Sequence, residues 1–240
     1  MVQIIEIATS DFEGTKNAVA GGADRIELCA NLGEGGTTQS YGVIKTCRES
    51  FDIKIYPIVR VRGGDFLYTG EEFECMRKDA MMCKEIGTDG VVIGFLNIDG
   101  SIDMRRTAKI VEAMYPLGVT FHRAFDRCKN PFEAMEQLIE IGCERILTSG
   151  QQKTAPEGAE LISTLNKQAN GRIIIMPGSG VRASNIKQLA ETTGCKEFHT
   201  SLREHTNSKM NFITPAFEGD EENGHYSVNS NAVKALRETL

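Results

Sequence analysis

The stretch GVTFHRAFDRCKNPFE, residues 118–133, contains the unit from which the fold is built. It begins as a short apolar strand that runs to Phe125 and carries ionisable side chains such as His122 near its end. Asn130 and Pro131 then predict the start of a helix, because asparagine can cap free N–H groups and proline suits the first helical position. A strand, a loop and a helix therefore follow one another within a few residues.

The same unit recurs along the whole chain. Eight short runs are candidate strands, at residues 3–9, 25–29, 54–61, 90–96, 118–125, 145–150, 172–178 and 197–202. Helix signals lie between them, namely capping boxes at Ser10 with Glu13 and at Thr69 with Glu72, and terminating glycines at Gly87, Gly142 and Gly194. Strands that alternate with helices form a parallel sheet, and eight of them close into a (β/α)8 TIM barrel at about 250 residues.

An open doubly wound sheet is the alternative fold. It requires no such regular count of strands, and the first strand–helix turn, ATSDFEG at residues 8–14, lacks the G-x-G-x-x-G of dinucleotide-binding sheets. No linker or change of composition divides the 240 residues. We therefore expect residues 1–240 to form a single (β/α)8 barrel domain of the α/β class, with a long loop over residues 203–227 after the last strand.

Composition argues against several classes of protein. The net charge is −6 and the basic residues are scattered, which disfavours a nucleic-acid partner or an anionic membrane surface. No segment approaches the ~18 apolar residues that span a bilayer, and the start lacks the basic region of a signal peptide. The seven cysteines show neither zinc-site nor disulfide spacing. We expect a cytoplasmic protein with reduced thiols.

Alternation along the strands predicts which side chains enter the barrel. In a closed barrel, successive strand residues face the lumen and the surrounding helices in turn. Every second residue from Ile55 to Val61 is apolar, so Arg60 and Arg62 belong to the inner face, near the C-terminal end where barrel active sites lie. The same alternation and the adjacent loops give the candidate catalytic residues Glu6, Glu27, Arg60, Arg62, Asp65, His122, Asp126 and His199.

These side chains predict either a stabilising network or a reactive cleft. Buried charges cost several kcal/mol unless they are paired, and Glu6 and Glu27 could pair with Arg60 and Arg62. A closed network would only stabilise the top layer of the barrel, although apolar layers serve stability better. In a solvated cleft, His122, or else Glu6 or Glu27, would exchange protons, and the arginines would hold a planar anion. His122 suits this role because the unperturbed pKa of histidine is about 6.5. We favour the cleft.

A second signal is the turn after the seventh strand. Gly178, Ser179 and Gly180 precede a predicted helix, and backbone N–H groups in such a turn bind anions well. In barrels, the loops after strands seven and eight frequently hold a phosphate, and Ser201 ends strand eight. The alternative is a tight turn without a ligand, because glycine pairs after strands are common.

With these residues identified, the chain resembles the CutC family, which is named for copper homeostasis. The resemblance covers nearly the whole chain and rests on the stretches GGADRIELC, EGGTTQSYGVI, RVRGGDF, DGVVIGFL, VTFHRAFD, RILTSG and GSGV. It implies a cytosolic (β/α)8 barrel that forms homo-oligomers, such as dimers or tetramers, and handles copper. Relatives often carry proline at the position of Val61 and cysteine at the position of Ala8. Because copper(I) prefers thiolates, Cys29 and Cys128 are the candidate copper ligands here.

Three functions remain open. The resemblance favours copper binding and copper homeostasis. The polar mouth favours instead a lyase, isomerase or hydrolase that acts on a small anionic or phosphorylated metabolite. A third possibility is an oligomeric scaffold or sensor that uses the long final loop as its interface, because structureless loops of that length are usually lids, binding loops or contacts.

Overall fold

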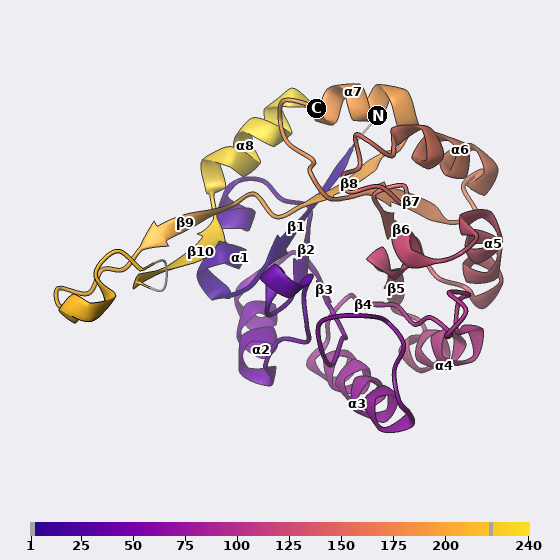
Figure 1. Ribbon diagram of the computed structural model, residues 1–240, viewed down its shortest axis with the longest axis horizontal. Helices are drawn as coiled ribbons and strands as arrows, with labels where there is room; N and C mark the ends of the chain where they lie inside the picture. The colour runs from indigo at the N-terminus through magenta and orange to yellow at the C-terminus, as the bar shows by residue number, and fades with distance from the viewer. Residues whose placement is uncertain (1–2, 221–222) are drawn as a thin grey trace.

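Eight parallel strands form a closed barrel, and eight helices among the described residues surround it (Figure 1). The structure is a computed structural model, and it describes residues 3–220 and 223–240. The barrel strands are β1 (Ile4–Thr9), β2 (Arg25–Leu28), β3 (Lys54–Pro57), β4 (Gly90–Ile93), β5 (Gly118–Phe121), β6 (Arg145–Thr148), β7 (Ile174–Pro177) and β8 (Glu197–Thr200). The helices are α1 (Phe12–Ala20), α2 (Tyr41–Ser50), α3 (Gly70–Ile86), α4 (Met104–Met114), α5 (Pro131–Ile141), α6 (Ala159–Ala169), α7 (Ile186–Thr193) and α8 (Ser230–Thr239). The predicted (β/α)8 fold is confirmed.

The barrel closes through two four-stranded sheets. One sheet has the order β3-β2-β1-β8 and the other the order β4-β5-β6-β7. Parallel bridges between Ile58 and Val92 and between Gly178 and His199 join the two sheets at both seams. Because all strands run in parallel, their C-terminal ends meet at one mouth, and the loops that follow them surround it.

Most predicted helix signals have the expected geometry. Thr69 and Glu72 form a reciprocal capping box at the start of α3, and Asn130 caps α5 with proline at its first turn. The three terminating glycines adopt the left-handed conformation at the ends of α3, α5 and α7. The prediction for Ser10 was wrong. Asp11 caps α1, with its Oδ1 accepting from the amide of Gly14.

The hydrophobic core has two layers. A large outer cluster lies between strands and helices and includes Ile55 and Val59 of the third strand segment. A smaller inner cluster contains Cys29, Tyr56, Ile58 and Val92, which fill part of the lumen. The alternation expected for the third strand is therefore correct, and it places the next inner residue, Arg60, at the mouth.

The connection after β8 differs from the unstructured loop that we expected. Strands β9 (Arg203–Asn207) and β10 (Gly224–Val228) pair as an antiparallel hairpin, and a short 3-10 helix, η3 (Pro215–Phe217), lies in the segment between them. Figure 1 shows this hairpin projecting from the barrel wall near α1. The described helices all lack the length and apolar character that a membrane crossing requires.

Candidate functional site

A cavity of about 910 Å³ opens at the C-terminal mouth of the barrel. Its size lies in the range of small-molecule sites, and residues from most of the strands contribute to its walls. Of the side chains predicted for the site, Glu27, Arg60, Asp65, His122, His199, Ser179, Gly180 and Ser201 line it. Arg62, Asp126 and Gly178 are not among its lining residues, and Glu6 lies beneath His199.

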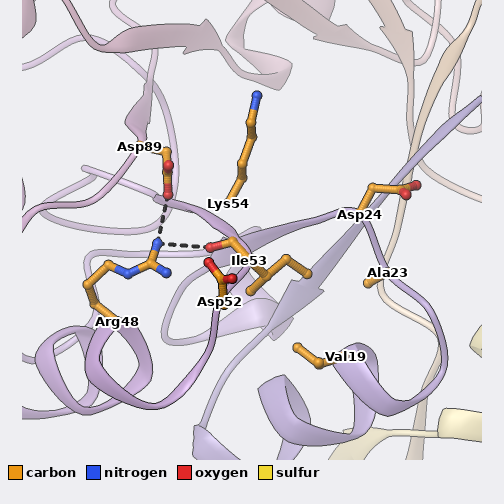
Figure 2. Close-up of a pocket in the computed structure, with 8 residues that line it drawn as sticks. All are labelled: Val19, Ala23, Asp24, Arg48, Asp52, Ile53, Lys54 and Asp89. Atoms are coloured by element: carbon orange, nitrogen blue, oxygen red, sulfur yellow. Dashed lines mark hydrogen bonds and ion pairs between the residues drawn. The ribbon is translucent and has the colours of Figure 1, made fainter.

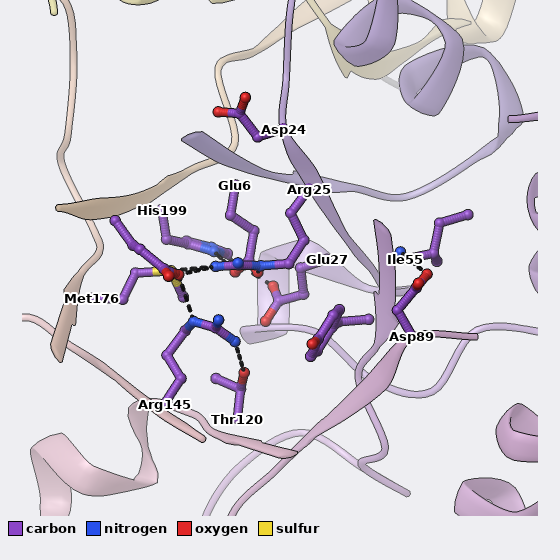
Figure 3. Close-up of polar contacts among 12 residues, drawn as sticks. Glu6, Asp24, Arg25, Glu27, Ile55, Asp89, Thr120, Arg145, Met176 and His199 are labelled. Atoms are coloured by element: carbon purple, nitrogen blue, oxygen red, sulfur yellow. Dashed lines mark hydrogen bonds and ion pairs between the residues drawn. The ribbon is translucent and has the colours of Figure 1, made fainter. Parts of the chain in front are cut away.

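Below the cavity, ion pairs cross the interior of the barrel (Figure 3). Arg25 and Arg145 both contact Oε2 of Glu197, each at 2.6 Å, and Nε of Arg25 also contacts Glu6. All of these side chains are buried or nearly so, and mutual pairing offsets the cost of removing their charges from water. Thr120 accepts a further hydrogen bond from Arg145 at 3.0 Å.

This network corrects the predicted pairing. Glu6 pairs with Arg25 rather than with Arg60 or Arg62. Charged residues also occupy inner positions at the strand beginnings, since Arg25, Arg145 and Glu197 open their strands and point inward. The signal was present, since Arg25 lies two residues before Glu27 and must share its face.

A carboxylate–imidazole pair lies at the floor of the cavity. Nδ1 of His199 donates to Oε1 of Glu6 at 2.8 Å, and Nε2 of His199 lies 3.7 Å from Oε2 of Glu27. Burial raises the pKa of Glu6, but Arg25 and the bond from His199 outweigh it and lower the pKa overall. Glu6 is therefore ionised, and its acceptor role directs Nε2 of His199 toward Glu27.

No cation contacts Glu27 as closely as Arg25 contacts Glu6. Burial raises its pKa from 4.5 to about 7, although His199 and the more distant Arg25 act in the opposite direction. Burial also lowers the pKa of His199, but Glu27 and Glu6 overcome this effect and raise it above 6.5. Near neutral pH the pair can therefore hold and release a proton.

His122, one of the proton carriers suggested by the sequence, has the surroundings of a neutral hydrogen-bond donor. Its Nδ1 accepts from the amide of Ala124 at 3.1 Å, so the proton of the neutral ring is on Nε2. Burial, assisted by the charge of Arg60, lowers the pKa of His122 to about 3 and keeps the ring neutral. Nε2 is buried and has no hydrogen-bond partner among the described residues.

The two arginines of the third strand segment hold loops. Arg60 donates to the carbonyls of Glu34, Gly36 and Gly64 at 2.8–2.9 Å, which occupies both of its terminal nitrogens. Arg62 points away from the cavity and contacts Glu72 at 2.6 Å and Asp65 at 3.1 Å. The expectation that this pair clamps an anion is therefore not supported by their geometry.

Asp126 also has a structural role, because it holds two loops together. It lies in a 3-10 turn, η2 (Arg123–Arg127), and accepts from the amide of Ser149 at 3.0 Å and from Nε of Arg123 at 2.7 Å. These contacts fasten the loop after β5 to the loop after β6. The predicted position of Asp126 inside the lumen was wrong, because the strand ends at Phe121 and the turn changes the alternation.

The turn after β7 borders the cavity and contains two free backbone amides. Ser179 and Gly180 have φ values of 79° and 72°, and no acceptor for their N–H groups occurs among the described residues. Gly178 instead donates to Thr148 as part of the barrel wall. Arg182 and Ser201 complete this corner, which we call the anion corner, defined by Ser179, Gly180, Arg182 and Ser201.

Sequence reasoning missed three further arginines that line the cavity beside Arg60. They are Arg123, Arg127 and Arg182. Each lies in a loop just after a barrel strand, and this position shortly after a strand end is the feature from which the sequence could have predicted them. Their positive charges give the mouth an environment suited to anions.

Copper(I) does not fit the donors found here. In the described part of the chain, Glu6, Glu27 and His199 are the group of acidic, histidine or cysteine residues close enough to share a cation. Arg25 and His199 already occupy Glu6, which leaves too few free ligands, and none is a thiolate. Cys29 lies in the inner cluster and Cys128 in the outer one, so the predicted pair of thiol ligands does not form.

A second pocket, of about 400 Å³, lies at the opposite end of the barrel (Figure 2). Arg48 crosses it and contacts Asp89 and the carbonyl of Ile53, each at 2.8 Å. Asp89 also accepts from the amide of Ile55. These bonds join α2 to the start of β3, at the face where barrels place stabilising residues.

Comparisons with known proteins agree with this architecture. The model of the CutC family matches residues 3–204. A protein of Parabacteroides distasonis named family protein CutC is 54% identical over 213 residues, which cover 88% of each chain. The human copper homeostasis protein cutC homolog is 45% identical over 87% of this chain and 77% of its own length. The crystal structure of CutC from Streptococcus agalactiae superposes with a TM-score of 0.80 at 32% identity, covering 83% of this chain and 99% of that one. The chain belongs to the CutC family.

Proposed function

We propose that this protein is an enzyme that binds a small anionic molecule at the C-terminal mouth of the barrel. The observation that carries the proposal is a buried, incompletely paired carboxylate, Glu27, at the floor of a cavity that also contains the anion corner. A purely structural network would pair this carboxylate as fully as it pairs Glu6, because uncompensated burial of charge reduces stability. Buried ionisable groups with shifted pKa values cluster at active sites.

The anion corner supports an anionic ligand. Two free amides lie in the same turn as Arg182 at the cavity wall, and Nη1 of Arg182 donates to Oγ1 of Thr200 at 3.1 Å and to the carbonyl of Val181 at 2.9 Å. Amide groups in a turn and a nearby guanidinium are the usual donors for phosphate or carboxylate oxygens. The remaining arginines of the mouth would attract such a ligand from solution.

Calorimetry with inorganic phosphate tests this proposal. We expect binding to the wild type and a loss of about ten- to a hundredfold in affinity for Arg182→Gln, since one charge-assisted hydrogen bond contributes about 1.5–3 kcal/mol. Arg172→Gln is the matched control, because Arg172 pairs with Glu136 on the outer surface. Absence of phosphate binding, or equal weakening by both substitutions, would remove support for the anion corner.

Copper handling is the second candidate, favoured by the names of relatives such as the human homologue. Copper would then be the cargo of the protein. Cys29, two residues after Glu27 in the sequence, is the candidate thiol, although burial raises its pKa well above the usual value. A melting experiment with copper(I) tests the role, since a ligand at one hundred times its dissociation constant adds about 2.7 kcal/mol. If copper(I) raises the melting temperature equally in wild type, Cys29→Ser and Cys128→Ser, neither thiol is its ligand.

We also propose that the β9–β10 hairpin contacts a second copy of the chain. Met210, Phe212 and Phe217 in the segment between the two strands are more than half exposed. A two-stranded hairpin is marginally stable alone, and contiguous exposed apolar side chains mark interaction surfaces. Light scattering should find an oligomer that Phe212→Ser with Phe217→Ser converts to monomer; a wild-type monomer would contradict this assignment.

A further inference from the structure

We infer that the mouth of the barrel catalyses proton transfer at the carbon beside a carbonyl group, in a small phosphorylated hydroxyaldehyde or hydroxyketone. This inference rests on the proposed function and deepens it by naming a reaction class and a substrate class. Three groups on different strands carry it: the Glu27 carboxylate, the Nε2–H of His122 and the anion corner.

Glu27 has the position of a base. Its carboxylate is buried at the end of β2, lines the cavity, and has no hydrogen-bond donor among the described residues. The nearest cationic group, Nε2 of His199, is 3.7 Å away, too far for a hydrogen bond. The oxygens of Glu27 therefore remain available to a proton of a molecule in the cavity.

His122 supplies the complementary donor from another wall. The bond from Ala124 to Nδ1 fixes the tautomer, so Nε2–H is the donor of the ring. This group is buried without an acceptor among the described residues, which costs free energy in the unliganded protein. A ligand oxygen that accepts this bond would remove that penalty, and an oxygen that becomes negative would gain most.

Two features keep the donor in place. The Phe66 ring packs against the imidazole with a centroid distance of 5.0 Å. On another side, Gly94 leaves room for the ring, because a Cβ there would approach Cε1 of His122 to 2.3 Å. A donor held this rigidly is preorganised for charge that develops only during a reaction.

The anion corner anchors the remote end of the molecule. Its free amides follow β7, whereas Glu27 ends β2 and His122 follows β5, so the three groups surround one cavity of about 910 Å³. A phosphate at the corner would place a short carbon chain across the mouth. The ligand would then present its carbonyl oxygen and the adjacent C–H bond to His122 and Glu27.

The chemical step is balanced without an oxidant, a reductant or a metal. The Glu27 carboxylate takes the proton from the carbon beside the carbonyl, and the C–H electron pair forms a double bond to the carbonyl carbon. The carbonyl oxygen becomes an enolate oxygen that accepts the hydrogen bond from His122, which keeps its own proton. The Glu27 carboxyl then returns a proton to the same carbon, giving exchange. The isomer forms when the proton of the adjacent hydroxyl group first moves to the enolate oxygen and Glu27 then protonates the former carbonyl carbon, so that the adjacent oxygen becomes the new carbonyl oxygen.

Protonation states support this division of roles. The pKa of Glu27 is raised to about 7 by burial, against the influence of His199 and Arg25, and Glu6 adds to the increase. A base poised near neutral pH combines adequate basicity with a substantial ionised fraction. The pKa of His122 is lowered to about 3, chiefly by burial, and a neutral imidazole can polarise a carbonyl.

Hydrogen exchange in D2O tests the inference with defined probes. Dihydroxyacetone phosphate, ribulose 5-phosphate and fructose 6-phosphate are incubated with the protein, and NMR follows loss of the C–H signal beside the carbonyl. We expect exchange above the buffer rate for at least one probe. Glu27→Gln should reduce it about 10³-fold, and His122→Leu about 10²-fold, whereas His122→Gln, which keeps an N–H donor, should retain more. Glu136→Gln, on the outer surface, is the control.

The outcomes separate the two proposals. Phosphate binding with no exchange in any probe overturns this inference and leaves the proposed function standing. Exchange that survives Glu27→Gln assigns the base elsewhere and also overturns it. Failure of phosphate and of all three probes to bind would overturn the proposed function itself. Calorimetry on each variant verifies that lost exchange does not reflect lost binding or unfolding.

Discussion

Replacing Glu27 by glutamine should stabilise the protein above neutral pH, even though it removes the candidate base. The pKa of Glu27 rises from 4.5 to about 7 on folding, mainly through burial. Each pKa unit corresponds to about 1.4 kcal/mol, so ionised Glu27 lowers the free energy of unfolding by about 3 kcal/mol at pH 8. Glutamine has the same shape and no charge, and it resembles the protonated acid.

The effect should depend on pH in a defined direction. A group whose pKa is raised by folding contributes its stability at low pH and loses it as pH rises through the folded pKa. Glu27 and His199 are both in this class, so wild-type stability should fall between pH 5 and pH 8. At pH 5 Glu27 is protonated in the folded wild type but mostly ionised in the unfolded chain, so Glu27→Gln should stabilise the protein by less than about 1 kcal/mol there.

Urea denaturation at pH 5, 7 and 8 measures this difference. The free energy of unfolding of Glu27→Gln should exceed that of the wild type by up to about 3 kcal/mol at pH 8 and by less than about 1 kcal/mol at pH 5. Glu136→Gln at the surface serves as the control and should change little at any of these pH values. If Glu27→Gln destabilises the protein at pH 8, or stabilises it equally at pH 5 and pH 8, the buried-charge reasoning is refuted.

Three further substitutions test other parts of the structure by chemical denaturation. Arg145→Met should lower the free energy of unfolding by about 3–5 kcal/mol, because Glu197 keeps its buried charge with one partner fewer; a loss below 1 kcal/mol would contradict a central network. Asp11→Ala should lower the free energy of unfolding by about 1 kcal/mol because it removes a helix cap, and Ser10→Ala should leave it almost unchanged. A larger loss for Ser10→Ala than for Asp11→Ala would support the capping box predicted from the sequence. Gly180→Ala should lower the free energy of unfolding by about 1–2 kcal/mol, because the φ of Gly180 is 72° and a Cβ there would lie 2.9 Å from Thr154. It should also weaken phosphate binding, and an unchanged phosphate affinity would show that the anion binds elsewhere.

The architecture followed from local patterns. Apolar runs, caps and terminating glycines depend on a few neighbouring residues, and their regular recurrence predicted eight strand–helix units. Alternation then placed Glu6, Glu27 and His199 on inner faces, since the period of a strand is two residues regardless of its neighbours. The same rule failed for Asp126, where a 3-10 turn begins two residues after the end of the strand.

Local patterns could not assign partners across the lumen. Glu6 and Arg25 are neighbours because β1 and β2 pair in a register that sets these two residues side by side, and Glu197 meets both Arg25 and Arg145 only because the barrel is closed. Arg60 was expected to bind an anion, but the loops on either side offered it three carbonyl oxygens. Such contacts depend on distances between segments that are remote in sequence.

The sequence by itself determined the barrel, the inner face of each strand and the residues that gather at the mouth, because each of these depends on periodicity within a short segment. Only the tertiary structure decided which acid is neutralised and which is not. Glu6 and Glu27 are both buried glutamates on neighbouring strands, but Arg25 contacts one and leaves the other with a histidine at 3.7 Å. Burial without a close counter-charge raises the pKa of Glu27, and that difference in environment distinguishes a structural carboxylate from a candidate base.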